Sequence, residues 1–200
     1  MDQLDTGDIL LFKGSPKSII SKVTDSPYTH AAIVVKDPWW GNLKKGLYVI
    51  QSLDSKPDYK DVETNTYRSG VQMEKLKVAI GDRDVDIRHI FGVKRNNKFK
   101  KLFKRIHMDT FLKPYDKKCI DWFTVGVSNL FCKNCKVLRH SNNFWCSALV
   151  GYFYTKLGWL PSYTDWSNLS PGDLANIRTN PPFMLGRVTP LKVGKMYTLF

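Results

Sequence analysis

One stretch of the sequence places a cysteine in the first turn of a helix that we expect to be buried. Asn142 and Asn143 are candidate N-caps, and an apolar run follows them as far as Gly158. Cys146 then lies at a helix N-terminus, where the partial positive charge favours a thiolate and free amides can bind an oxyanion. Free cysteine is also a common core residue, so a packing role is the alternative.

A histidine and a glutamine supply the partners that a reactive cysteine needs. The β-branched run of residues 28–36 predicts a buried strand that begins near His30. Residues 47–52 predict the next strand, and a hairpin would bring Gln51 close enough to fix the His30 tautomer. The alternatives are a structural histidine and an ordinary polar residue at a strand end.

The chain is strongly basic, and its cations gather in one helix. The 31 Lys and Arg against 18 Asp and Glu give a net charge of +13, which attracts polyanions such as nucleic acid or an anionic membrane. Apolar residues at helical spacing between 99 and 106 predict an amphipathic helix, whose charged face is either solvated or a binding surface. The candidate binding residues are Lys98, Lys100, Lys101, Lys104 and Arg105.

The remaining cysteines carry a weaker signal. Cys132 and Cys135 have the spacing of half a zinc knuckle or a redox pair, with Cys119 and His140 as conceivable further ligands. The second close-spaced pair of a structural zinc site is missing, so a surface loop with two incidental thiols is the favoured interpretation. We therefore expect no metal and no cofactor.

The length and patterning predict one domain over residues 1–200, with a first half made of about five strands in a meander. The acidic N-terminus does not resemble a signal peptide, and no apolar run is long enough to span a membrane, so we expect a cytoplasmic protein. The further expected elements are strands at 6–13, 66–76 and 85–94, helices at 17–24 and from Pro114 through Trp122 and Phe123, a short element after Ser170, an extended segment at 181–183 and a terminal strand or arm at 188–200.

Six short motifs occur in an order that resembles one family. They are Thr6-Gly7-Asp8-Ile9-Leu10, Thr29-His30-Ala31-Ala32-Ile33, Val49-Ile50-Gln51-Ser52, Thr66-Tyr67-Arg68-Ser69-Gly70-Val71, Pro114-Tyr115-Asp116 and Trp145-Cys146-Ser147-Ala148-Leu149-Val150. This series resembles the circularly permuted papain-like cysteine hydrolases. That NlpC-related group includes YiiX-like bacterial proteins, poxviral members and, more distantly, lecithin retinol acyltransferase.

The resemblance implies an α+β fold of the permuted papain-like (NlpC-type) class, with an antiparallel strand meander or small barrel packed against helices. It implies a thiol hydrolase or acyltransferase with Cys146 as nucleophile, His30 as base and Gln51 as the orienting residue. Relatives commonly carry a glutamate where this chain has Gln51, and a neutral amide does not stabilise an imidazolium. Low activity, or an inactive fold member that binds an anionic membrane or nucleic acid, is the alternative.

The substrates that the resemblance implies are a peptide, a lipidated protein or a lipid, and an anionic membrane surface is favoured over nucleic acid as a further partner. The poxvirus-like motifs suggest a viral protein, found in the host cytoplasm or the virion.

Overall fold

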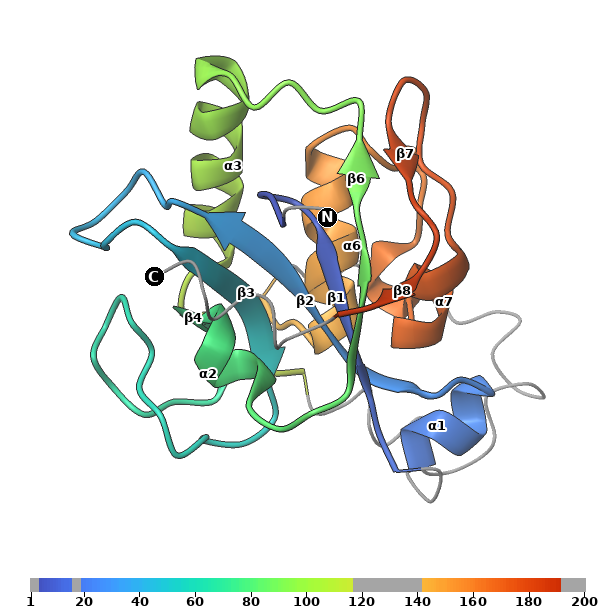
Figure 1. The fold of residues 1–200 in the computed structure, drawn as a ribbon, viewed down its shortest axis with the longest axis horizontal. Helices are drawn as coiled ribbons and strands as arrows, with labels where there is room; N and C mark the ends of the chain where they lie inside the picture. The colour runs from blue at the N-terminus through green and yellow to red at the C-terminus, as the bar shows by residue number, and fades with distance from the viewer. Residues whose placement is uncertain (1–3, 16–18, 117–141, 192–200) are drawn as a thin grey trace.

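The computed structural model describes residues 4–15, 19–116 and 142–191, and the fold combines strands with helices (Figure 1). The strands are β1 (Ile9–Lys13), β2 (Tyr28–Lys36), β3 (Leu47–Leu53), β4 (Gly70–Lys75), β5 (Val85–Arg88), β6 (Ile90–Phe91), β7 (Met184–Leu185) and β8 (Thr189–Pro190). The helices are α1 (Ile19–Thr24), α2 (Leu76–Ile80), α3 (Asn97–Thr110), α6 (Cys146–Lys156), the 3-10 helix η1 (Trp166–Asn168) and α7 (Pro171–Asn176). The predicted α+β class is confirmed.

Six of the strands form one antiparallel sheet in the order β4-β3-β2-β1-β5-β8. The predicted meander is therefore present, because β1 to β4 pair with their neighbours in sequence. The predicted small barrel is wrong for the residues that the structure describes, since β4 and β8 are edge strands and no pairing joins them. Strands β6 and β7 form a separate two-stranded ribbon.

The two faces of the sheet bury different clusters because successive side chains in a strand point to opposite sides. Leu10, Ala32 and Val49 pack with α2 on one face. Ile9, Ile33 and Ile50 pack with α3, α6 and α7 on the other face. Figure 1 looks onto the side covered by α2, with α6 behind the strands. Both faces are thus covered, which explains why polar residues in these strands become buried.

The predicted basic amphipathic helix is α3. Its N-cap is Asn96, whose side chain accepts a hydrogen bond from the Phe99 backbone N–H at 3.1 Å. Phe99, Phe103 and Ile106 are buried as the spacing predicts, whereas Leu102 is 36% exposed. The helix packs its apolar stripe against α6 and leaves the charged side in solvent.

Two expected strands differ from the structure for identifiable reasons. The strand expected at 66–76 begins only at Gly70 and ends before Leu76, which opens the unpredicted helix α2. The strand expected at 85–94 splits into β5 and β6 around His89. Buried Asp8 accepts hydrogen bonds there from the Ile90 N–H at 3.0 Å and from His89 Nδ1 at 2.8 Å, so the backbone turns towards the carboxylate.

Several sequence predictions lie partly or wholly outside the described residues. They include the helix through Trp122 and Phe123, the loop with Cys132 and Cys135, Cys119 and His140, and the arm beyond residue 191. The short element after Ser170 is α7, which begins with a capping box between Ser170 and Asp173. In the part of the chain that is described, no helix is both long enough and apolar enough to cross a bilayer.

Candidate active site

Cys146 is the first residue of α6, as the sequence predicted. The N-cap, however, is Trp145 rather than Asn142 or Asn143, and its side chain makes no capping hydrogen bond. The helix start is fixed instead by its neighbours: the Phe144 carbonyl accepts from Ser52 Oγ of β3 at 2.6 Å, and the Trp145 indole donates to the Ser167 carbonyl at 3.0 Å. The first-turn amides of α6 consequently remain free of a side-chain cap.

The Cys146 thiol lies in a buried site that contains backbone donors. The residue is 4% exposed, and the backbone N–H groups of Ala31, Ser147 and Cys146 itself, with the Ser147 side chain, act to lower the pKa of its thiol. These donors stabilise the thiolate, but burial outweighs them and raises the pKa of the Cys146 thiol above its ordinary value. Loss of solvation therefore exceeds the help that the helix N-terminus gives to the thiolate.

His30 and Gln51 are in direct contact. His30 Nε2 lies 2.5 Å from Gln51 Oε1, and an amide oxygen can only accept, so the ring proton is on Nε2. The other ring nitrogen, Nδ1, is then unprotonated and able to act as a base. Desolvation lowers the pKa of His30 to about 4, with the hydrogen bond that His30 donates to Gln51 acting in the opposite direction, so the imidazole is neutral near pH 7.

A carboxylate that the sequence analysis missed stands behind Gln51. Gln51 Nε2 donates to Glu74 Oε1, and it also lies 3.4 Å from the Tyr59 hydroxyl. Gln51 and Glu74 are 0% and 1% exposed. Alternation in residues 70–75 places Gln72 and Glu74 on one side of a strand, which is the usual pattern of a solvated face. Glu74 is an interior group only because other parts of the fold cover that face, so the sequence held no signal that distinguishes it from a solvated residue.

Burial also determines the charge of Glu74. Desolvation raises the pKa of Glu74 to about 8, opposed by the positive charge of Arg83 and reinforced by the negative charge of Asp61. Arg83 lies over the Phe12 ring at 4.3 Å, and Phe12 in turn contacts the His30 ring at a centroid distance of 5.1 Å. Glu74 therefore titrates close to physiological pH instead of near 4.5.

The site lies where two strands separate. Pairing between β2 and β3 ends at Ile33 and Ile50, whereas β3 continues to pair with β4 as far as Leu53. His30 and Gln51 bridge this separation through their side chains. The start of α6 and the residues just before it contact the same two strands one residue further along, at Ala31 of β2 and Ser52 of β3.

Hydrogen bonds thus connect only two of the three predicted site residues to each other. His30 and Gln51 share a hydrogen bond, and the backbone N–H of Ala31, the residue that follows His30, acts to lower the pKa of the Cys146 thiol. Within the described part of the chain, no hydrogen bond links the Cys146 thiol to the His30 ring. Catalytic hydrogen bonds are often long without substrate and shorten in its complex. The predicted basic residues of α3 are all exposed.

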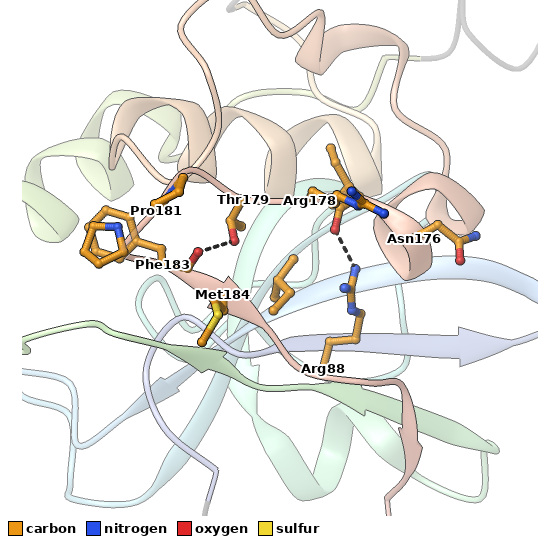
Figure 2. Close-up of a pocket in the computed structure, with 10 residues that line it drawn as sticks. Arg88, Asn176, Arg178, Thr179, Pro181, Phe183 and Met184 are labelled. Atoms are coloured by element: carbon orange, nitrogen blue, oxygen red, sulfur yellow. Dashed lines mark hydrogen bonds between the residues drawn. The ribbon is translucent and has the colours of Figure 1, made fainter.

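A pocket of about 460 Å³ lies elsewhere, between Arg88 of β5 and the segment 176–185 (Figure 2). Arg88 is 7% exposed, and its guanidinium donates to the carbonyls of Leu174, Ile177 and Gly186 at 2.7, 3.2 and 3.0 Å. Two of these acceptors belong to the end of α7, where a cation complements the helix dipole. We assign Arg88 a structural role at this position.

The fold and the site define an α+β protein whose antiparallel sheet carries a hydrogen-bonded histidine–glutamine pair and whose helix α6 begins with a cysteine. The structure resembles that of the metalloprotein yiiX from Escherichia coli O157:H7, with a TM-score of 0.50 and 19% sequence identity over 78% of this chain and 67% of that chain. At this identity the likeness establishes the fold alone. No protein-family model and no curated protein matches the sequence.

The description as a metalloprotein belongs to yiiX and not to this chain. Among residues 4–15, 19–116 and 142–191 of this chain, no group of three or more His, Cys, Asp or Glu side chains is arranged to hold a metal ion. The Cys132 and Cys135 pair lies outside these ranges.

Proposed function

We propose that this protein is a papain-like thiol hydrolase or acyltransferase that attacks an amide or ester carbonyl through Cys146. The observation that carries the proposal is the contact between His30 Nε2 and Gln51 Oε1, which leaves Nδ1 free to accept a proton. The Ala31 backbone N–H, which helps to lower the pKa of the Cys146 thiol, belongs to the strand that carries this base. The permuted papain-like resemblance of the sequence assigns the same three residues.

The pKa directions favour a general-base mechanism over a resting ion pair. The raised pKa of Cys146 and the lowered pKa of His30 make both groups neutral at pH 7. His30 Nδ1 therefore takes the thiol proton as the sulfur bonds to the carbonyl carbon. The carbonyl π electrons move to oxygen, and the first-turn amides of α6 are suitable donors to that oxyanion.

Collapse of the tetrahedral intermediate completes the transfer. The oxygen electrons re-form the carbonyl, the carbon–nitrogen or carbon–oxygen bond breaks, and His30 gives its proton to the leaving amine or alcohol. The product is a thioester on Cys146. Water, or another acceptor activated by His30, then releases the acyl group and regenerates the thiol. Peptides, lipidated proteins and lipids all present carbonyls suited to this chemistry.

The test is the reactivity of one cysteine among four. We would treat the full-length protein with a limiting amount of an electrophilic thiol probe and locate the label by peptide mass spectrometry. We expect Cys146 to react faster in the folded wild type than in the folded His30→Ala variant. The two proteins should react at the same rate when they are unfolded in urea. Equal labelling of Cys146 in the wild type and the His30→Ala variant, both folded, would overturn it.

A second candidate function rests on α3. Lys98, Lys101 and Arg105 follow one side of the helix, all exposed, and the described residues contain no ion pair to any of them. Exposed Leu102 and Met108 occur on the same helix. Cations interleaved with apolar side chains suit an anionic membrane surface better than a nucleic acid groove. We propose this helix as a membrane contact that operates with or without catalysis.

A further inference from the structure

Three neighbouring strands contribute one residue each to a continuous chain of hydrogen bonds. His30 of β2 contacts the oxygen of the Gln51 amide on β3, and the nitrogen of that amide donates to Glu74 on β4. Gln51 is fully buried, so neither end of its amide can turn towards bulk water. The orientation of this amide therefore determines whether His30 faces its oxygen or its NH₂ group.

The direction of the amide follows from the chemistry of its two partners. An ionised carboxylate only accepts hydrogen bonds, so it must face the NH₂ end of Gln51. The oxygen end then faces His30 and requires a proton on Nε2. Reversing the amide would oppose its oxygen to the carboxylate and would place its NH₂ against His30, which would move the ring proton to Nδ1.

We propose that ionised Glu74 is a positioning residue which, through Gln51, holds His30 in the tautomer whose Nδ1 is free to act as the base. This inference rests on the function proposed for Cys146 and His30 and adds a proton-linked control to it. Protonated Glu74 can donate as well as accept, so it tolerates both directions of the Gln51 amide. The productive tautomer is then only part of the population.

The surroundings of the chain support a transition near neutral pH. Burial raises the pKa of Glu74 to about 8, and the charges that act on Glu74 are Arg83 and Asp61, with the Tyr59 hydroxyl as a hydrogen-bond donor. On the His30 side the acting charges are Arg83 and Asp54. The base-competent tautomer therefore gains as pH rises through about 8, because Glu74 then becomes an obligatory acceptor.

The test compares the alkylation rate of Cys146 with pH in four full-length proteins, read at the Cys146 peptide by mass spectrometry. The Glu74→Gln substitution keeps the size of the side chain, but the new amide can donate as well as accept a hydrogen bond at every pH. Asp61→Asn removes the charge that raises the pKa of Glu74. Lys75→Gln, which removes an exposed charge from the next position of β4, is the matched control.

We expect the ratio of wild-type to Glu74→Gln rates to be near one at about pH 6 and to reach roughly threefold or more at about pH 9, the gain from making one hydrogen bond charge-assisted. Asp61→Asn should move this rise to lower pH, and Lys75→Gln should leave it in place. Long-range ¹H–¹⁵N spectra of the imidazole should show the Nε2-protonated tautomer of His30 increasing with pH in the wild type and in Lys75→Gln, but not in Glu74→Gln.

The outcomes separate the two proposals. If His30→Ala slows Cys146 but Glu74→Gln leaves both the rate profile and the tautomer unchanged, the role of Glu74 is overturned and the proposed function stands. If His30→Ala has no effect on folded Cys146, the proposed function fails. The tautomer spectra then judge Glu74 alone, since they require no reaction at sulfur.

Discussion

The Gln51 amide nitrogen donates a hydrogen bond to the Glu74 carboxylate, and this contact connects an acid on β4 to the candidate base on β2. The papain-like reaction that we propose requires a group that holds the histidine, and we assign this role to the Gln51 amide with the Glu74 carboxylate behind it. The absence of a carboxylate at position 51 therefore does not leave this site without one.

The first prediction exchanges the two side chains. Gln51→Glu alone sets two carboxyl groups against each other, so we expect a loss of stability that grows as pH rises, measured by urea unfolding. The double variant Gln51→Glu, Glu74→Gln restores a donor opposite an acceptor and places the charge beside His30. It should recover stability and alkylate Cys146 faster than Glu74→Gln alone. Additive effects of the two substitutions would show that they are not coupled.

The second prediction concerns Glu74 and the pH dependence of stability. Its folded pKa of about 8 exceeds its ordinary value of 4.5, so the native state holds the proton more tightly than the unfolded chain does. The stabilisation is complete below pH 4.5 and is lost as pH rises through 8. Relative to Glu74→Gln, wild-type unfolding free energy should fall by at most about 1.4 kcal/mol per pH unit in this window. Parallel curves for the two proteins would contradict the buried, protonated carboxyl.

The third prediction has the opposite sign and concerns His30. Its folded pKa of about 4 lies below its ordinary value of 6.5, so the unfolded chain binds the proton more readily. Its contribution is present above pH 6.5 and is lost as pH falls towards 4. His30→Leu should therefore lose less stability than the wild type between these limits, as measured by urea titrations at several pH values. A wild type that is no more acid-sensitive than the variant would argue against a desolvated ring.

The fourth prediction tests the exposed face of α3. Reversing charge at Lys100, Lys101 and Lys104 should weaken sedimentation with phosphatidylserine-containing vesicles, and wild-type binding should fall as salt rises. Lys44, Lys45 and Lys75 are exposed and lie outside α3, so their reversal makes an equal change in net charge as a control. If both triple variants lose binding equally, attraction is due to total charge and α3 has no special role.

The fifth prediction separates the Arg88 pocket from the candidate active site. Arg88→Leu leaves three carbonyl groups without their donor, and we expect a cost of about 2 kcal/mol or more in unfolding free energy. Alkylation of Cys146 in the folded variant should be unchanged. A stable variant with altered Cys146 reactivity would instead place Arg88 in the function of the site.

The sequence by itself determined the elements that carry the candidate site. Apolar alternation and the β-branched run placed His30 and Gln51 on adjacent strands, and the apolar stretch after residue 143 placed Cys146 at a helix start. The stripe of Phe99, Phe103 and Ile106 predicted α3. These features depend on local periodicity, which the order of residues records directly.

Only the tertiary structure decided which groups are covered and what that does to their protons. Position 74 follows the pattern of a solvated strand face, yet α2 and its flanking residues cover that face and raise the pKa of Glu74 to about 8. The same effect opposes the helix N-terminus at Cys146 and keeps its thiol protonated. Desolvation depends on what distant segments place around a group, so no local pattern in the sequence specifies it.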